Sequence, residues 1–513
     1  MNRKLCAVIL LVAAMTLAGC VRNEGVEPAE EEERIRISIA YWNIEDTFQG
    51  DAVLDAIEEK FNVTFEPVKI TWDDHYDKIR SWAVMDSFPD LFVGDFKGTS
   101  EYSQWAGEGL LHAIPEDLSA YPDLEEYMAG FQDDNITGED GKVYCIPRQT
   151  YPSQPWTCLD RIIVYRWDLA QQAGVTREPE TWDEFQEMIL AIIQADPENT
   201  GIQGMTLNNR TIISGILLPY ASALAVSGKW KLDEDGLYKP AYFADDLTPA
   251  FQLGRDMYQS GVIERDALLE TKSSAYEKFL RGENAALLDS GGYGGNYKEL
   301  AAYWKDYHGS DYTEDVKALR LMSDVNGNKT YPLWGYTWSE SYISAKVEPE
   351  KLDKILQIYD YLLSDEGMFL GTYGPEGDLY EIVDGKVQMY DENTVVQDKY
   401  PSCGVFSNLV RWVSCSYDGW YAADIPEAYI RINYELVQEA ETVPIPAYEP
   451  ECNAILDDEQ INFLIDSGND FLRIMTGTEL VDEMWMELLQ EYESKGLREM
   501  IDLVNVKMQE RGK

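Results

Sequence analysis

The stretch that decides the fold class is residues 35–70, which read IRISIAYWNIEDTFQGDAVLDAIEEKFNVTFEPVKI. Apolar side chains alternate with other residues from Ile35 to Tyr41, which is the period of a β-strand. They then recur at helical spacing from Val53 to Phe61, and a second strand is indicated from Val63 to Val68. The stretch therefore predicts a strand, a helix and a second strand in succession.

The pattern continues with another helix and a third strand. Apolar residues recur at helical spacing from Tyr76 to Ala83, and Leu91 to Val93 form a short buried run. Strands that alternate with helices imply right-handed crossovers and a mainly parallel sheet. Ligands of such sheets lie beyond the carboxyl ends of the strands, so Trp42 and Asp95 are candidate site residues.

Composition and charge exclude several classes of protein. The chain has 513 residues, and 45% of them are hydrophobic, which is enough for more than one core. The formal net charge of -51 repels a phosphate backbone, so no nucleic acid is expected as a partner. Histidine occurs only 3 times, which leaves little material for histidine-based metal or triad chemistry.

The N-terminus has the features of an export signal. A basic start is followed by an apolar run from Leu5 to Leu17, which is too short to span a bilayer. Leu17-Ala18-Gly19-Cys20 resembles the bacterial lipobox, in which the cysteine is lipidated after cleavage. We therefore predict a signal peptide at 1–19, a lipidated Cys20, and an acidic tether over 20–34 that holds the body at the outer face of the membrane. An ordinary secretory signal with a chance cysteine is the alternative.

Five cysteines remain in the body, and an odd number cannot all pair. Cys145 with Cys158, or Cys403 with Cys415, could close short loops in an oxidising exterior. Cys452 is the fifth, and buried free thiols are an equally good interpretation.

Two local motifs have a structural and a functional interpretation. Thr181 and Glu184 have the spacing of a capping box, in which each side chain binds the backbone amide of the other residue. Trp182 lies inside that motif, so we assign it to packing and not to a ligand. The run from Ser290 to Gly295 does not match a phosphate-binding glycine pattern, so we interpret it as a flexible cleft loop that carries Tyr293.

Several segments, in this order, resemble the extracellular solute-binding lipoproteins, family 1, of bacterial carbohydrate ABC importers, especially their long subgroup. The segments run from end to end of the chain and are SFPDL at 87–91, GKVYCIP at 141–147, VYRWDL at 164–169, TWDEF at 181–185, FLRGENAA at 279–286 and YGPEG at 373–377. Each is weak alone, but their order and spacing together with the lipobox are specific.

The resemblance implies a two-lobed α/β fold like that of periplasmic binding proteins, with each lobe a mainly parallel sheet flanked by helices. The lobes would close as a monomer around a sugar or oligosaccharide and hand it to ABC transporter permease subunits. The chain would cross between lobes near Tyr144 to Arg166, near Ala285, and from Trp334 to Ser344. No cofactor is implied.

These crossings assign discontinuous segments to each lobe. Lobe 1 is expected to comprise 35–150 plus 285–330, and lobe 2 is expected to comprise 151–284 plus 331–513. The body after the tether has 513 - 34 = 479 residues, which is enough for two lobes of ordinary size.

One departure from the long subgroup concerns calcium. Some of its members carry a calcium loop after the capping-box helix, and here Asp196, Glu198 and Thr200 could supply three oxygens. Gly204 and Leu207 occupy the ninth and twelfth positions, so the late bidentate acid is absent. We therefore predict no metal site.

A sugar presents apolar C–H faces and hydroxyl groups, which bind to aromatic rings and to a few hydrogen-bonding groups. Aromatic residues concentrate in the proposed crossings and in the segment 411–421. The candidate ligand-binding residues are Trp42, Asp95, Arg148, Trp156, Tyr293 and Trp338.

Two other classes of function stay open. A surface-anchored glycan-processing enzyme would need paired carboxylates, and with 93 acidic residues a nearby pair carries no information. The chain lacks the common nucleophile and zinc-hydrolase motifs, so no enzyme activity is predicted. A peptide-binding or scaffolding lipoprotein fits the anchor equally well.

Overall fold

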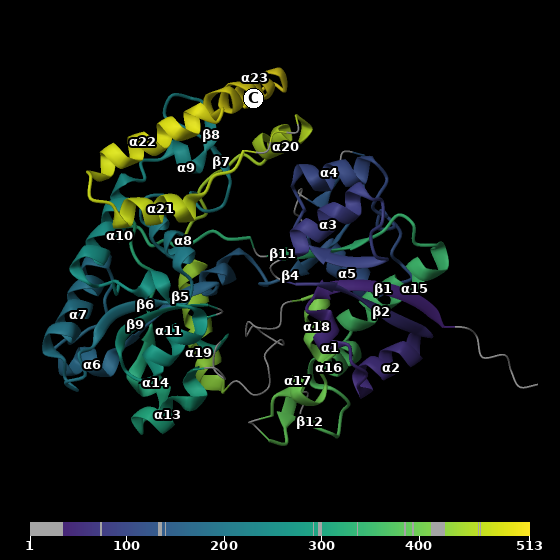
Figure 1. Cartoon of the computed structure of the whole chain (residues 1–513), viewed down its shortest axis with the longest axis horizontal. Coiled ribbons are helices and arrows are strands. Elements are labelled where there is room, and N and C mark those ends of the chain that lie inside the picture. The colour runs from purple at the N-terminus through teal and green to yellow at the C-terminus, as the bar shows by residue number, and fades with distance from the viewer. Residues whose placement is uncertain are drawn as a thin grey trace, which may run out of the picture.

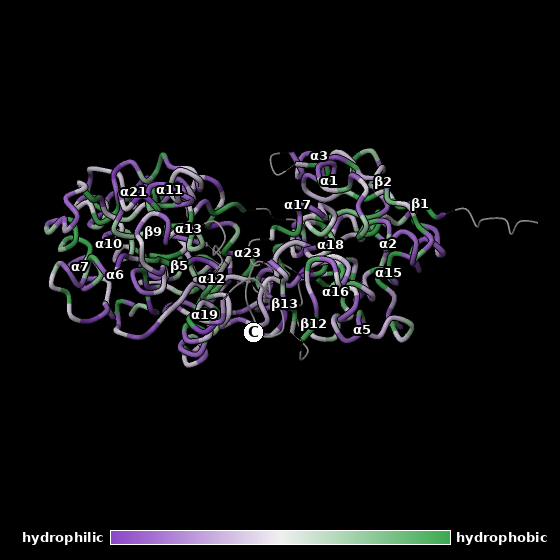
Figure 2. Tube along the Cα trace, turned by 90° about the horizontal axis from the view of Figure 1, so that it is seen from below, coloured by the Kyte–Doolittle hydropathy of each residue, from purple (hydrophilic) through white to green (hydrophobic). Residues whose placement is uncertain are grey.

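Two α/β lobes, each with its own sheet and core, lie side by side (Figures 1 and 2). The computed structural model describes residues 34–513 except 72–73, 132–135, 139, 291, 296–299, 336, 384–385, 392–393, 412–425, 460 and 462. The predicted signal peptide and Cys20 lie outside these residues. Within them, no helix has the length and apolar character needed to cross a membrane.

The sheet of lobe 1 has the strand order β2-β1-β3-β11-β4. Its strands are β1 (Ile35–Trp42), β2 (Val63–Ile70), β3 (Leu91–Gly94), β4 (Ile146–Gln149) and β11 (Thr337–Ile343). β1 pairs in parallel with both β2 and β3, whereas β11 is antiparallel to β3 and to β4. The predicted strand–helix pattern and the parallel pairing of the first three strands are confirmed.

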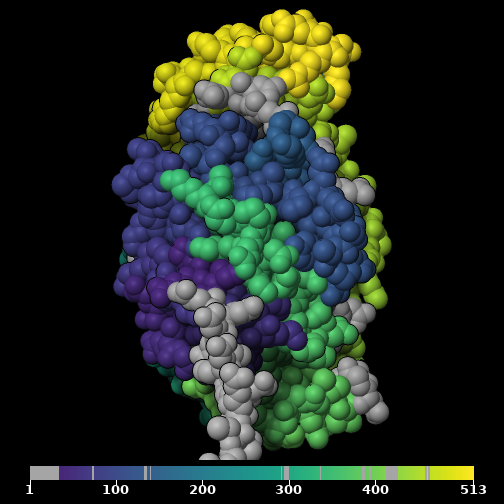
Figure 3. All heavy atoms as spheres, turned by 90° about the vertical axis from the view of Figure 1, so that its right-hand side faces the viewer, coloured from purple at the N-terminus to yellow at the C-terminus, as the bar shows by residue number. Residues whose placement is uncertain are grey.

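Helices from two separate parts of the chain cover this sheet. They are α1 (Ile44–Thr47), α2 (Ala52–Phe61), α3 (His75–Val84), α4 (Ser100–Gly107), α5 (Pro122–Ala129), α15 (Pro349–Leu363), α16 (Asp365–Tyr373), α17 (Val396–Lys399) and α18 (Cys403–Leu409), with the hairpin β12 (Tyr380–Val383) and β13 (Lys386–Met389). On the outer side of this lobe, α15 packs against α2 and α5. In Figure 3 the green segment, from later in the chain, therefore lies between purple and blue segments from its beginning. The core of lobe 1 therefore joins residues far apart in sequence.

The sheet of lobe 2 has the strand order β10-β5-β9-β6. Its strands are β5 (Arg161–Arg166), β6 (Gln203–Leu207), β9 (Asn284–Ser290) and β10 (Val316–Ala318), and a separate hairpin joins β7 (Trp230–Leu232) to β8 (Tyr238–Pro240). β6 and β9 are parallel, whereas β5 is antiparallel to β9 and to β10.

Two hydrophobic clusters and many helices surround this second sheet. The helices are η2 (Gln154–Leu159), α6 (Trp167–Gln172), α7 (Trp182–Ala195), η3 (Arg210–Ile212), α8 (Ile213–Leu217), η4 (Leu218–Tyr220), α9 (Ala241–Ala244), α10 (Thr248–Ser260), η5 (Ala267–Leu269), α11 (Lys272–Leu280), α12 (Gly292–Gly295), α13 (Ala302–His308), α14 (Tyr312–Asp315), α19 (Glu427–Ala440), α20 (Glu451–Asp458), α21 (Ser467–Thr476), α22 (Val481–Ser494) and α23 (Leu497–Glu510). α20 reaches back across and touches α4 of lobe 1 (Figure 1).

The predicted division of the chain between lobes is wrong in two places. β9, which contains Ala285, lies between β5 and β6 in lobe 2, so 285–330 does not belong to lobe 1 and the chain does not cross near Ala285. β11 lies in the lobe-1 sheet, and the lobe-1 core continues to Val410, so 331–513 is not one lobe-2 segment. A buried apolar strand carries no local mark of which sheet it joins.

Each sheet contains one strand that runs against the rest, and it is the first sheet strand after a crossing. β5 follows the crossing near residue 150, and β11 follows the crossing between Leu333 and Thr337. The chain enters each lobe at the edge where the parallel strands end, so its first strand must run away from that edge. The predicted crossings near 150 and near 334–344 agree with this topology.

The predicted capping box forms only in part. The Thr181 hydroxyl accepts a hydrogen bond from the Glu184 amide at 3.3 Å. The Glu184 carboxylate instead accepts from the Glu180 amide at 2.9 Å and pairs with Arg177, because an adjacent cation competes for it. Trp182 is buried in the lobe-2 core, which confirms its assignment to packing.

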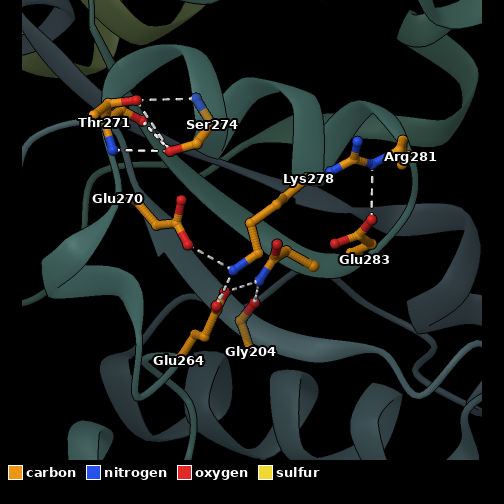
Figure 4. A network of polar contacts seen from close by, with 9 residues as sticks. Gly204, Glu264, Glu270, Thr271, Ser274, Lys278, Arg281 and Glu283 are labelled. Carbon is orange, nitrogen blue, oxygen red and sulfur yellow. Dashed lines mark hydrogen bonds and ion pairs between the residues drawn. The ribbon is translucent and has the colours of Figure 1, made fainter.

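The FLRGENAA segment at 279–286 serves the architecture of lobe 2 (Figure 4). Gly282 has φ +76°, which allows the tight turn from α11 into β9. Asn284 is fully buried and donates to the Gly204 carbonyl at 3.1 Å and to Glu264. Lys278 pairs with Glu264 and, at 2.9 Å, with Glu270. This polar network ties α11 to β6 and β9.

The cysteines of the described residues form no disulfides with one another. Cys145, Cys158, Cys403 and Cys452 are all buried, and the Cys145–Cys158 disulfide is not formed. Cys415 lies outside the described residues. Burial raises the pKa of the Cys158 thiol to about 12, which keeps it neutral.

Candidate functional site

The carboxyl ends of β1 and β3 meet β4 and β11 at the edge of lobe 1 that lies toward lobe 2 (Figure 1). This edge brings together three of the six predicted ligand-binding residues in direct contact, namely Trp42, Arg148 and Trp338. Asp95 follows β3 at the same edge and is half-buried.

Trp42 and Trp338 form a stacked pair. Their ring centroids are 5.5 Å apart and their planes differ by only 9°. Trp42 is 3% exposed, whereas Trp338 is 36% exposed. Trp42 is therefore the buried member of the pair, and Trp338 is the member that solvent reaches.

A β-bulge in β11 presents Trp338. Thr337 pairs with Gln149 and Glu340 pairs with Pro147, so the register shifts between these two pairs. Ser339 lies inside the bulge with φ +63°, a left-handed conformation that is uncommon for serine, and its side chain is buried. Bulges redirect side chains and are common beside functional sites. Here the bulge places an exposed indole on an otherwise buried strand.

Arg148 supports both indoles from inside lobe 1. Its side chain is fully buried, and its guanidinium carbon lies 4.9 Å from the Trp42 ring centroid and 5.2 Å from that of Trp338. The guanidinium donates to the Asn408 carbonyl at 3.0 Å and to the Tyr41 hydroxyl at 3.2 Å. Cation–π contacts and hydrogen bonds therefore hold the pair in one arrangement.

Two aromatic residues at the start of α3 extend the surface beside this pair. The His75 ring lies edge-on to that of Trp42, with 5.6 Å between ring centroids, and the centroid of the Tyr76 ring lies 4.1 Å from that of His75. Tyr76 is 38% exposed. Burial, and next the nearby Asp95 carboxylate, raise the pKa of Tyr76 to about 12, so its hydroxyl is a hydrogen-bond donor at neutral pH.

Glu340 is the buried acid of the site. Its Oε2 accepts from the Tyr342 hydroxyl at 2.6 Å and from the backbone amide of Phe96 at 3.1 Å. Burial, and next the charge of Asp95, raise the pKa of Glu340 to about 7. A carboxyl group that is neutral for part of the physiological range therefore lies two residues from the exposed Trp338 in β11.

Sequence reasoning did not identify His75, Tyr76 or Glu340. The first two begin the helix after β2, and a rule that included helix starts at the carboxyl edge of the sheet would have found them. Glu340 carries no local signal, because its burial depends on the turn after β3, more than 240 residues earlier.

Trp156 and Tyr293 do not join this group. Trp156 is 9% exposed in the lobe-2 core and lies edge-on to Tyr434 at 5.2 Å. Tyr293 is 4% exposed, donates its hydroxyl to the Val316 carbonyl at 2.7 Å, and stacks on Tyr429. The expected loop is a helical turn at Gly292–Gly295, because the backbone amide of Tyr293 is held by Asn433.

The remaining aromatic candidates fall into two groups. The Trp334 ring lies directly on Gly215 of lobe 2, where a Cβ would collide with it, so Trp334 anchors the crossing. Tyr336 and 412–421 lie outside the described residues.

The predicted calcium-loop residues have other partners. The two carboxylate oxygens of Asp196 accept from the amides of Thr200 at 2.9 Å and Gly201 at 3.0 Å. Glu198 pairs with Arg166 at 3.4 Å. Across the part of the chain that the structure describes, no three His, Cys, Asp or Glu residues form a group that could hold a metal ion.

A family model and a curated relative are similar to this chain over more than half of its length. The family model described as bacterial extracellular solute-binding protein matches residues 52–373, which is more than half of the chain. Lipoprotein LipO of Bacillus subtilis (strain 168) is 23% identical over 409 residues, which cover 75% of each protein.

Solved structures share the fold at low sequence identity. Alginate-binding protein AlgQ2, in a calcium-free crystal structure, is 15% identical with a TM-score of 0.69, over 92% of this chain and 98% of that one. A second structure is the EF-hand mutant of the ABC-transporter substrate-binding protein FusA of S. pneumoniae, in complex with fructo-nystose. It is 14% identical with a TM-score of 0.65, over 93% of this chain and 99% of that one. The two-lobed fold is therefore that of substrate-binding proteins.

Proposed function

This chain belongs to the bacterial extracellular solute-binding protein family, and we propose that it captures a sugar or oligosaccharide between its lobes for an ABC importer. The observation that carries the proposal is the partly exposed indole of Trp338, stacked on Trp42 at the inter-lobe edge of lobe 1. Indole faces bind the apolar faces of sugar rings, and a support that holds the indole in advance lowers the entropy lost on binding.

The roles of the candidate residues follow from their exposure. Trp338 stacks on the ligand, and Asp95 accepts hydrogen bonds from its hydroxyl groups. Trp42 and Arg148 are buried and hold Trp338 in place. This arrangement agrees with the prediction that the site lies beyond the carboxyl ends of the strands. Trp42 then holds Trp338 in place and does not itself contact the ligand.

We further propose that Trp156 and Tyr293 serve packing in lobe 2, because both are buried among aromatic and aliphatic neighbours. Their place near a crossing does not by itself give contact with a ligand.

The charge of the protein favours a neutral ligand. The formal net charge is -51, and Arg148, the cation closest to the indoles, is fully buried. The large negative charge of the protein would repel a polyanionic sugar. AlgQ2 is named an alginate-binding protein and the FusA structure holds fructo-nystose. Proteins of this fold therefore bind more than one class of sugar.

A glycan array tests ligand capture. The protein without its signal segment should bind one class of neutral oligosaccharide, and Trp338→Ala should lose that binding while remaining folded. Trp182→Ala is the matched control, since it removes a buried indole of lobe 2 and should retain affinity in the folded fraction. The proposal fails if no glycan binds, or if Trp338→Ala binds as well as the wild type.

Anchoring and delivery form the second part of the proposal. Cys20 would carry the lipid, and the name of the LipO relative supports a lipoprotein. Intact-mass analysis of membrane-extracted protein should show a lipidated N-terminal Cys20, and Cys20→Ala should release the protein or leave it uncleaved. An unmodified Cys20 in the membrane fraction would contradict this.

A further inference from the structure

Glu340 lies in β11, two residues after the exposed Trp338, and its side chain is fully buried. Its Oε2 accepts from the Tyr342 hydroxyl at 2.6 Å and from the amides of Phe96 at 3.1 Å and Lys97 at 3.3 Å. These two amides belong to the turn that follows β3 and begins with Asp95. One carboxyl oxygen of β11 therefore holds the turn that presents Asp95.

The other carboxyl oxygen of Glu340, Oε1, does not bind the turn. Oε1 of Glu340 is buried and has no hydrogen-bond partner among the described residues. An ionised carboxylate with one oxygen unpaired in a buried site is unfavourable, and the negative charge of Asp95 adds to that. Burial and Asp95 together raise the pKa of Glu340 to about 7.

Charged and titratable groups face Glu340 from every element packed around it. They are Asp95 and Lys97 of the turn, Tyr342 of β11, Tyr76 of α3, Tyr102 of α4 and Arg148 of β4. Their effects have opposite signs, because the two cations favour the ionised carboxylate and Asp95 opposes it. The three tyrosines have raised pKa values and stay neutral near pH 7.

We propose that Glu340 is a positioning residue that controls Asp95 through one exchangeable proton. Because Oε2 already accepts three hydrogen bonds, the proton binds to Oε1, the oxygen that lacks a partner. The neutral carboxyl then donates from Oε1 to the Asp95 carboxylate and draws it toward β11. The ionised carboxylate repels Asp95 toward the side on which Trp338 is exposed.

The consequence for binding rests on the function proposed above. While Glu340 engages Asp95, one acceptor site of the Asp95 carboxylate is occupied and the group is drawn toward β11, so it is less available to a sugar. Affinity should therefore be higher when Glu340 is ionised and lower when it is protonated. The site would release its ligand more readily in an acidic surrounding.

A ligand-free experiment tests the proton. Infrared difference spectra recorded between pH 5.5 and 8.5 resolve the C=O stretch of a protonated carboxyl from amide and carboxylate bands. The wild type should show such a band with a midpoint near 7. Glu340→Gln should lack it, and Asp95→Asn should shift its midpoint down by roughly one pH unit, because a neighbouring negative charge is removed.

A second measurement tests the positioning. In Glu340→Gln the amide nitrogen can take the place of Oε1 and donates at every pH, so this variant imitates the neutral carboxyl. Carbodiimide labelling at pH 8, read by mass spectrometry, should modify Asp95 several-fold more slowly in Glu340→Gln than in the wild type. The exposed Asp55 serves as the internal reference and should be labelled equally in both.

Three results would overturn the proposal: no wild-type band, a band that persists in Glu340→Gln, or a midpoint unchanged in Asp95→Asn. Equal labelling of Asp95 in both proteins would overturn the positioning role. If Glu340→Gln does not fold, Asp95→Asn still tests the coupling, because it leaves the hydrogen bonds of Glu340 intact. None of these measurements needs a ligand, so failure of the proposed function would be distinguishable.

Discussion

β5 and β11 occupy corresponding places in the two lobes, since each is the reversed strand that follows a crossing. β5 pairs with β9 without interruption from Arg161 to Tyr165, and its core residues are buried. β11 is interrupted by a bulge between Thr337 and Glu340, and the bulge exposes Trp338. The same topology thus produces an uninterrupted, buried strand in one lobe and a bulged strand that exposes an indole in the other.

The indoles near these strands follow the same contrast. Trp156, in the turn before β5, is packed by α19 and is 9% exposed, whereas Trp338 is 36% exposed. Position near a crossing therefore does not make an aromatic residue a ligand platform. Local backbone geometry and the cover from distant helices decide whether the indole is buried or exposed.

The largest expected effect concerns the packed indole. Trp156→Ala should lower the free energy of unfolding by about 3–5 kcal/mol, because it leaves a cavity between η2 and α19. Trp338→Ala should change stability far less, since its ring is partly in solvent. Denaturant unfolding of both variants measures the difference. An equal loss of unfolding free energy in the two variants would contradict the distinction between a packed indole near β5 and an exposed indole in β11.

The next effect is the pH dependence of stability from Glu340. Its pKa is raised from 4.5 to about 7 in the folded protein, so folding favours the protonated form. This contribution is complete below pH 4.5 and is lost as pH rises through 7; its size is roughly 3 kcal/mol at 1.36 kcal/mol per pKa unit. Relative to Glu340→Gln, the wild type should become less stable between pH 5 and 8. A constant difference in unfolding free energy across that range would contradict this.

Removal of the buried arginine of the site should have an intermediate effect. Arg148→Met deletes the donors to the carbonyls of Asn408 and Trp338 and leaves buried acceptors behind. We expect a loss of about 2 kcal/mol in unfolding free energy, together with weaker ligand binding because the support of Trp338 is lost. Unfolding and titration calorimetry measure the two effects. Unchanged affinity in Arg148→Met would show that Trp338 needs no support from it.

The binding effect of the exposed indole should be smaller and specific. Trp338→Ala should weaken binding of the array-identified glycan by about 1–3 kcal/mol, roughly five- to a hundredfold, because ring area and a directed contact are lost together. Trp156→Ala should bind normally in its folded fraction. The reverse pattern in calorimetric titrations would assign the platform to Trp156.

The smallest expected effect is the response to calcium at the far end of β5. The oxygens of Asp196 accept from backbone amides, and Glu198 pairs with Arg166, the last residue of β5. Calcium and a chelator should therefore leave the thermal unfolding midpoint unchanged. A reproducible rise in the midpoint with micromolar calcium would show that these oxygens are available to a metal.

Much of the fold was predictable because its signals are local. The alternation from Ile35 to Tyr41, the helical spacing from Val53 to Phe61 and the run at Leu91 to Val93 each report their own burial. The packing role of Trp182 was readable for the same reason, since the cap beside it starts a helix whose apolar face is buried. The edge of the sheet at Trp42 and Asp95 followed from strand order alone.

The tertiary structure decided what depends on distant partners. β9 joined lobe 2 because β5 and β6 lie on either side of it, and nothing within Asn284–Ser290 encodes that choice. Trp156 became core because α19, far along the chain, covers it. Glu340 is a buried acid because the turn at Phe96 closes over it. Periodicity records the environment of neighbouring residues, whereas burial and charge at this site arise from contacts between segments hundreds of residues apart.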